Sequence, residues 1–216
     1  MNNQKNIHQG QPVLQAGQPL EQAKAALLLV HGRGASAQSI LTLADELPHP
    51  EFAYLAPQAA NGAWYPNRFI APIESNEPYL TSALEIVGGL IQHITDAGIP
   101  PERIILLGFS QGACLAQEYA ARNPQRYGGL VGLSGGLIGP IGMEFSYPGS
   151  LAGTPVFLGC SDVDFHIPVE RVHESAQALE SLGGQVTTRI YPGMDHTVNM
   201  DEIEFVREMM QAVVAG

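Results

Sequence analysis

Cysteine, tryptophan and positive charge are all scarce in this chain of 216 residues. Its two cysteines, Cys114 and Cys160, allow one disulfide at most, and their spacing matches no metal-binding motif. We expect both to be buried thiols in a reducing compartment, and we expect no metal site. Ten basic residues against 21 acidic ones give a net charge of −11, which argues against nucleic acid and anionic membrane surfaces as partners.

Long apolar runs are also missing. No segment approaches the length that spans a bilayer, and the polar stretch 1–10 has no signal-peptide core. We therefore expect a cytoplasmic protein without stable membrane association. The remaining composition, 45% hydrophobic and 14% charged, is typical of a globular chain. The length suits a single domain over 1–216 with a loose tail at 1–10, and a homodimer is left open.

Apolar runs alternate with helix-like segments from residue 25 onward. Strands are expected at 25–30, 52–56, 104–107, 130–136, 155–159 and 186–191, with a weaker candidate at 11–18. Helices are expected at 36–47, 77–97, 113–122, 169–182 and 200–214. Two long segments, 58–78 and 137–153, are expected to be irregular. This order predicts an α/β fold, with a mostly parallel sheet, helices on both faces and no large cap domain.

The turn between the third expected strand and its helix reads Gly108-Phe109-Ser110-Gln111-Gly112. A serine in a Gly-x-Ser-x-Gly turn from strand to helix has its hydroxyl pushed out of the backbone, ready to act as a nucleophile. In a chain with 24 glycines, the alternative is a glycine-rich turn with an incidental serine. The strand before the motif and the helix after it favour the nucleophile.

A serine nucleophile needs a general base and a carboxylate that orients the base. His196 follows the last strand and precedes the last helix, although it could also be a helix-capping residue. His166 is its main rival as the base. Asp162 and Asp164 both follow the strand at 155–159 and compete as the acid. The order serine, acid, histidine is that of α/β hydrolases. The other histidines are expected on tails, loops or solvated faces, or, in one case, to shape a loop; they are His8, His49, His93, His173 and His31.

The substrate oxygen needs preorganised donors, and the backbone N–H groups of Gln111 and Arg33 are the best candidates. The Arg33 side chain is expected to be solvated, and the alternative is that it holds a polar part of the substrate. Aromatic residues of the long loop, Trp64 and Tyr65, are expected to wall an acyl pocket, with apolar surface added by Phe69, Ile70 and Phe165. The alternative for Trp64 is ordinary packing within the loop.

Four segments agree in order and spacing with one known family: His31-Gly32-Arg33-Gly34, Gly108–Gly112, Asp164–Pro168 and Gly193–His196. Over about residues 24–214 the chain resembles the phospholipase/carboxylesterase family of α/β hydrolases, which includes the acyl-protein thioesterases. The resemblance implies an α/β-hydrolase fold and a triad of Ser110, Asp164 and His196. Asp164 is preferred to Asp162 because the family places its acid four residues before a proline. The resemblance also implies an oxyanion hole from the Arg33 and Gln111 amides.

Together these inferences predict a serine carboxylesterase that hydrolyses esters of small to medium acyl chains through an acyl-enzyme, with no metal or organic cofactor and a small-molecule ester as its partner. A lysophospholipase or an acyl-protein thioesterase would use the same site. A non-catalytic binding protein on the same scaffold is the alternative of a different class. A nucleotide-binding protein is disfavoured, because the glycines at 32 and 34 lack the third glycine of that fingerprint.

Overall fold

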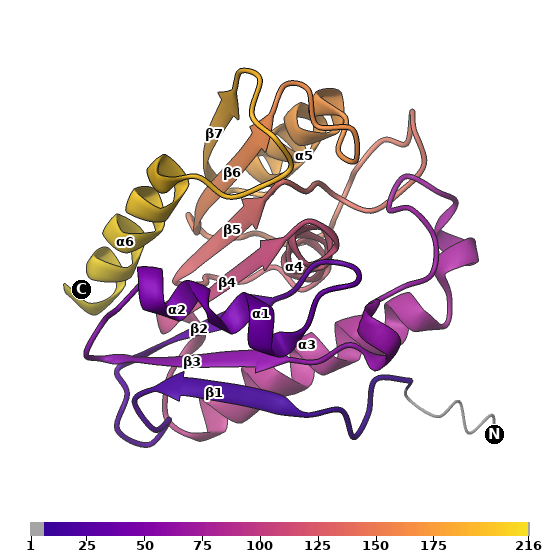
Figure 1. Ribbon diagram of the computed structural model, residues 1–216. Helices are drawn as coiled ribbons and strands as arrows, with labels where there is room; N and C mark the ends of the chain where they lie inside the picture. The colour runs from indigo at the N-terminus through magenta and orange to yellow at the C-terminus, as the bar shows by residue number, and fades with distance from the viewer. Residues whose placement is uncertain (1–6, 216) are drawn as a thin grey trace.

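A computed structural model describes residues 7–215, in which seven strands form one sheet in the order β1-β3-β2-β4-β5-β6-β7 (Figure 1). The strands are β1 (Val13–Gly17), β2 (Ala25–Val30), β3 (Phe52–Pro57), β4 (Ile104–Phe109), β5 (Gly129–Leu133), β6 (Pro155–Ser161) and β7 (Gln185–Tyr191). Only the edge strand β1 pairs antiparallel among these described strands, and every other pair is parallel. The predicted mostly parallel sheet is confirmed.

Helices cover both faces of the sheet. They are α1 (Ala37–Leu41), α2 (Leu43–Glu46), α3 (Tyr79–Asp96), α4 (Gln111–Arg122), α5 (Val169–Ser181) and α6 (Met200–Ala215), with short 3-10 turns η1 (Ala60–Gly62), η2 (Ile73–Asn76) and η3 (Pro101–Arg103). Figure 1 shows α1 and α2 in front of the sheet and α3, α4 and α5 behind it. Alternate strand residues therefore enter two cores, with Leu28 and Leu106 facing the α3–α5 side and Leu27 and Leu107 facing α1 and α6. Burial on both faces explains why these strands are apolar without alternation.

The helix expected at 36–47 is divided in two. Ser36 caps α1 as predicted, with a capping box to Ser39. At Thr42 the hydroxyl donates to the Ser39 carbonyl at 2.8 Å, and Asp45 N–H turns back to Thr42 O in a three-residue pattern. A side-chain hydroxyl that competes for helix carbonyls weakens the regular ladder, and the helix breaks there.

The expectation of a loose tail over 1–10 is not met at His8, whereas Gln9 and Gly10 are exposed; residues 1–6 lie outside the described range. His8, expected on a solvated segment, is 1% exposed. Its ring nitrogens bond to Trp64 O at 2.9 Å and Ala60 N–H at 3.0 Å, and burial lowers its pKa. The start of the described chain is therefore anchored on the loop that follows β3.

The parallel strands bring their carboxyl ends to one edge of the sheet, as expected. The segments after β2, β3, β4, β6 and β7 all begin there, and they carry the residues singled out above. Within residues 7–215, no helix combines the length and apolarity that crossing a membrane requires.

Candidate active site

Ser110 occupies a strained turn between β4 and α4. Its backbone has φ 54° and ψ −119°, and its N–H donates to Leu133 O at 2.9 Å. A non-glycine residue in such a conformation costs roughly 1–3 kcal/mol, a strain that recurs at functional sites. The flanking glycines are required by close approach: an added Cβ would lie 2.2 Å from Gly112 O at Gly108, and 2.0 Å from Val30 O at Gly112. The motif thus forms the tight strand-to-helix turn that the sequence predicts.

His196 and Asp164 form a hydrogen-bonded pair beside this turn. Asp164 Oδ2 lies 2.6 Å from His196 Nδ1, while Oδ1 accepts the N–H groups of His166 and Ile167 at 2.8 and 3.1 Å. Burial alone would raise the pKa of the Asp164 carboxyl, but the hydrogen bond from His196 and the two backbone donors outweigh it, so the pKa is below its ordinary value. Since an ionised carboxylate only accepts, Nδ1 carries the proton and Nε2 is left with a lone pair.

Asp162, the competing acid, lies elsewhere. Its Oδ1 accepts the Gly193 N–H at 2.8 Å, which ties the loop after β6 to the loop after β7. Of the two aspartates, only Asp164 bonds to His196 in the structure. Asp162 bonds a backbone amide, as expected for the residue that loses this competition.

The two amides expected to bind an oxyanion belong to residues that line the same pocket as Ser110. In the part of the chain that the structure describes, neither the Arg33 nor the Gln111 N–H donates to a protein acceptor. The Arg33 backbone comes close because residue 32 is glycine: an added Cβ there would lie 3.3 Å from Ser110 Cβ. Gln111 is also the first residue of α4, where a helix N-terminus favours negative charge.

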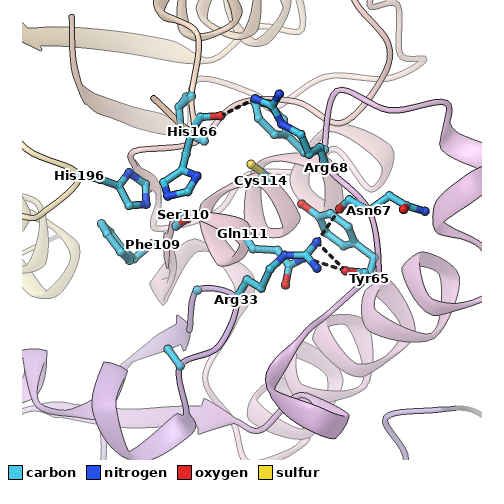
Figure 2. Close-up of a pocket in the computed structure, with 14 residues that line it drawn as sticks. Arg33, Tyr65, Asn67, Arg68, Phe109, Ser110, Gln111, Cys114, His166 and His196 are labelled. Carbon is cyan, nitrogen blue, oxygen red and sulfur yellow. Dashed lines mark hydrogen bonds between the residues drawn. The ribbon is translucent and has the colours of Figure 1, made fainter. Parts of the chain in front are cut away.

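The pocket has a volume of about 260 Å³ (Figure 2). Its lining residues are Gly32, Arg33, Ala35, Tyr65, Asn67, Arg68, Phe69, Phe109, Ser110, Gln111, Cys114, His166, Ile167 and His196. Ser110, His196, Arg33, Gln111 and Tyr65 are thus brought together as predicted from sequence. His166, the rival base, is here too, with its ring centroid 4.8 Å from that of His196.

The expected place of Trp64 in the pocket wall is wrong. The indole is fully buried and does not line the pocket. Its Nε1–H donates to His31 O at 2.8 Å, and its ring packs between His8 and His31 with centroids 5.4 and 5.0 Å away. Phe165 lies outside the lining set as well. It is 77% exposed, and its ring centroid lies 4.0 Å from that of His166. Its contact with substrate stays a prediction.

The Arg33 side chain is not free in solvent, contrary to expectation. Its guanidinium donates to Tyr65 O at 2.8 Å and Asn67 O at 2.5 Å (Figure 2). It also donates to Pro66 O at 2.7 Å. Three carbonyls of an irregular loop need donors, and this arginine supplies them. Arg33 therefore fixes the loop that forms one side of the pocket.

Sequence reasoning missed the side chain of Gln111, having considered only its amide. Oε1 accepts the Trp64 N–H and Nε2 donates to Tyr65 O, both at 2.9 Å. Through these two bonds Gln111 holds the same loop in place that Arg33 holds. The available signal was the length of the 58–78 segment, whose backbone groups must find side-chain partners if the loop is ordered.

Arg68, Asn76 and Cys114 were missed as well. Arg68 and Cys114 line the pocket. Asn76 is fully buried and holds Asn67 N–H and Arg68 O at 2.8 and 3.2 Å. Burial raises the pKa of the Cys114 thiol to about 12, so it stays protonated and does not compete with Ser110 as a nucleophile. Cys160 is a buried free thiol too, as predicted.

The segment 137–153 contributes no residue to this pocket. It is irregular as predicted. Arg171 of α5 holds its first part by donating to Leu137 O, Gly139 O and Pro140 O at 2.9, 2.7 and 3.1 Å. Among residues 7–215, no cluster of His, Cys, Asp or Glu is arranged to hold a metal ion.

The sequence profile of the phospholipase/carboxylesterase family matches residues 14–214. Acyl-protein thioesterase 1 of Kluyveromyces lactis is 30% identical over 202 residues, covering 84% of this chain and 89% of that protein. Acyl-protein thioesterase 1 of Gibberella zeae is 36% identical over 129 residues, which span 56% of this chain and only 54% of the relative.

Among solved structures, a phospholipase/carboxylesterase from Dyadobacter fermentans superimposes with a TM-score of 0.89 and 42% identity, covering 94% of this chain and 97% of the other. The match of the profile to nearly the whole chain agrees with the sheet order and with the turn at Ser110. The chain therefore belongs to the phospholipase/carboxylesterase family of α/β hydrolases and is a serine hydrolase.

Proposed function

We propose that this protein is a serine carboxylesterase that hydrolyses esters of small to medium acyl chains through Ser110, His196 and Asp164. The observation that carries the proposal is that Ser110, on its strained turn, lines one pocket with a histidine whose Nδ1 is bonded to the buried side chain of an aspartate. This arrangement supplies a nucleophile, a base and an orienting carboxylate.

In the first half of the reaction, His196 Nε2 takes the Ser110 proton as the hydroxyl attacks the ester carbonyl. Asp164 stabilises the imidazolium that forms, and the low pKa of its carboxyl favours the ionised state this role needs. The negative charge on the substrate oxygen is stabilised by the Arg33 and Gln111 N–H groups. His196 then gives its proton to the alcohol oxygen, the C–O bond breaks, and an acyl-enzyme remains on Ser110.

In the second half, water enters where the alcohol left. His196 takes a proton from water as its oxygen attacks the acyl-enzyme carbonyl, and the same two amides face the new oxyanion. The proton then returns to the Ser110 oxygen, which releases the carboxylic acid and restores the free enzyme. Atoms balance with one ester and one water consumed for each acid and alcohol produced.

The second candidate is an acyl-protein thioesterase, because relatives at 30% and 36% identity carry that name. The pocket volume of about 260 Å³ lies below the range of roughly 300–1,000 Å³ that is usual for drug-sized ligands. This favours a small ester over a long acyl chain. A profile of kcat/KM against acyl length tests the choice: a marked preference for long chains or for acyl thioesters would favour the thioesterase.

The direct test is Ser110→Ala, assayed with short p-nitrophenyl esters. We expect a loss of kcat of about 10³-fold or more, because removing any triad member leaves only residual catalysis. The matched control is Ser134→Ala, since Ser134 also has a positive φ, of 52°, and directly follows the neighbouring strand β5. The control should keep its turnover. Unchanged turnover in Ser110→Ala, with both variants folded by circular dichroism, would refute the proposal.

The non-catalytic alternative has its own test. A fluorophosphonate reacts with an activated serine and leaves an incidental one unmodified. Intact-mass measurement should find one adduct on the wild-type protein and none on Ser110→Ala. A wild-type protein that stays unlabelled and cleaves no ester would favour a binding protein on this scaffold.

A further inference from the structure

Two arginines line the pocket, and only one of them uses its guanidinium for several hydrogen bonds to the protein. Arg33 donates to three loop carbonyls. The Arg68 guanidinium makes a single long contact, from Nη2 to His166 O at 3.3 Å (Figure 2). Among the described residues, Arg68 has no carboxylate partner, whereas five other cationic side chains do. Most of the Arg68 hydrogen-bonding capacity is therefore left for another group.

The charge around Arg68 is unusual for this protein. The chain carries a net charge of −11, yet the residues lining the pocket include two arginines, two histidines and no carboxylate. The ionised Asp164 lies outside the lining set, bonded to His196. The pocket mouth is thus a positive region on an acidic molecule, and such a region attracts small anions.

Hydrogen bonds hold the Arg68 backbone in place, although the side chain is exposed. Its carbonyl accepts the Asn76 side-chain amide at 3.2 Å and the Ala71 N–H at 3.0 Å. Asn76 is fully buried, and it also accepts the Asn67 N–H. An arginine that starts from an anchored loop needs little reorganisation to bind a ligand.

We propose that Arg68 binds a carboxylate carried by the substrate, so that the preferred substrate is a compact ester bearing a negative charge. This inference rests on the proposed esterase function. A guanidinium presents paired N–H donors that match the two oxygens of a carboxylate. The group could sit on the acyl part, as in a monoester of a short dicarboxylic acid, or on the alcohol part; two substrate pairs separate these cases.

The first pair is p-nitrophenyl butyrate and mono-p-nitrophenyl succinate, which differ by a carboxylate at the end of the acyl chain. The second is methyl 4-acetoxybenzoate and 4-acetoxybenzoate, which differ by a carboxylate on the leaving group. Each is assayed with the wild-type protein, Arg68→Gln and Arg68→Lys. The control is Arg103→Gln, because Arg103 also lacks a carboxylate partner among the described residues but lines a cavity at the other end of the sheet.

The wild-type protein should prefer the anionic member of at least one pair by kcat/KM. Arg68→Gln should lower kcat/KM for that member by about 10- to 100-fold and for the neutral member by no more than about twofold, as expected for loss of one charged hydrogen-bonding partner. Arg68→Lys should keep part of the preference, and Arg103→Gln all of it. Added salt should reduce the preference, because the pocket mouth is open to solvent.

Preference for the neutral ester in both pairs would overturn the inference, and so would an equal loss for both members in Arg68→Gln. Neither result touches the esterase proposal, which depends on whether neutral esters are turned over at all and whether Ser110→Ala stops that turnover. An enzyme inactive on all four substrates would contradict the proposed function itself.

Discussion

The sheet carries a cavity at each end, and the two differ in chemistry. The pocket at the carboxyl ends of the strands has about 260 Å³ and contains Ser110 and His196. At the opposite end, a cavity of about 500 Å³ lies where β4, β5 and β6 begin. It is lined by Glu102, Arg103, Arg126, Gly128, Pro155, Phe205, Glu208, Met209, Ala212 and Val213. None of these described residues offers a hydroxyl, thiol or imidazole.

The proposed site thus lies in the smaller of these two cavities, and the chemistry of the two sheet edges accounts for the difference. Each βα turn at the carboxyl edge ends a strand and starts a helix, so that free N–H groups and a side chain can face one point. The turn at Ser110 does both, since α4 begins at the next residue. At the opposite edge the chain enters strands from loops and helix ends, and the larger cavity has no comparable turn.

The largest expected effect comes from two substitutions near the small pocket, at the carboxyl ends of the strands. Asp164→Asn should lower kcat by about 10³- to 10⁴-fold, because an amide at this position no longer fixes His196 in the tautomer with Nδ1 protonated. Asp162→Asn should cost only about threefold, because an asparagine oxygen can still accept the Gly193 N–H. Steady-state kinetics on a p-nitrophenyl ester measures both. If Asp162→Asn loses more than Asp164→Asn, the assignment of the acid is reversed.

Sequence reasoning predicted the sheet and the turn at Ser110 because both are encoded by residues close together in the chain. The choice of Asp164 as the partner of His196 came from the family resemblance. Unbroken apolar runs such as 25–30 and 104–107 predict strands buried on both faces, and the structure has strands there. The glycines around Ser110 are needed by contacts within the turn and with the adjoining strand β2. Features that depend on neighbours along the chain are therefore predictable from the sequence.

The errors arose where partners lie far apart in sequence. His8 is buried by Ala60 and Trp64, 52 and 56 residues away, and nothing in a polar terminal segment predicts that contact. Arg33 reaches carbonyls 32 to 34 residues on. A lone polar side chain looks solvated in sequence, because the backbone groups that it satisfies belong to a loop whose path is unknown.

A smaller effect distinguishes the two ends of α6, whose later residues line the larger cavity. Glu202, near its start, is fully buried beside Gly159, and burial raises the pKa of its carboxyl to about 7. The unfolded chain releases this proton near 4.5. The folded state therefore holds more protons between these values, and the stability contributed by protonated Glu202 falls as pH rises through that window.

Glu202→Gln cannot ionise, so relative to the wild-type protein it should gain up to about 3 kcal/mol in unfolding free energy between pH 4.5 and 8. Urea unfolding at several pH values measures the difference. Glu208→Gln is the control for removing a carboxylate from the same helix, because Glu208 is exposed and lines the other cavity. The burial argument is contradicted if the gain for Glu202→Gln does not grow with pH or is no larger than that for Glu208→Gln.

The last test fills each cavity with the same side chain. Ala35 lines the small pocket and Ala212 the large one. Ala35→Trp should lower kcat/KM for a butyrate ester by about tenfold or more, because an ester and an indole compete for the same space. Ala212→Trp fills a larger volume at the end of the sheet that carries no reacting group, and we expect kcat/KM within about twofold of wild type. Thermal unfolding of both variants separates steric exclusion from loss of fold. A strong loss of activity in folded Ala212→Trp would mean that the two ends are coupled, since the substituted side chain lies across the sheet from Ser110.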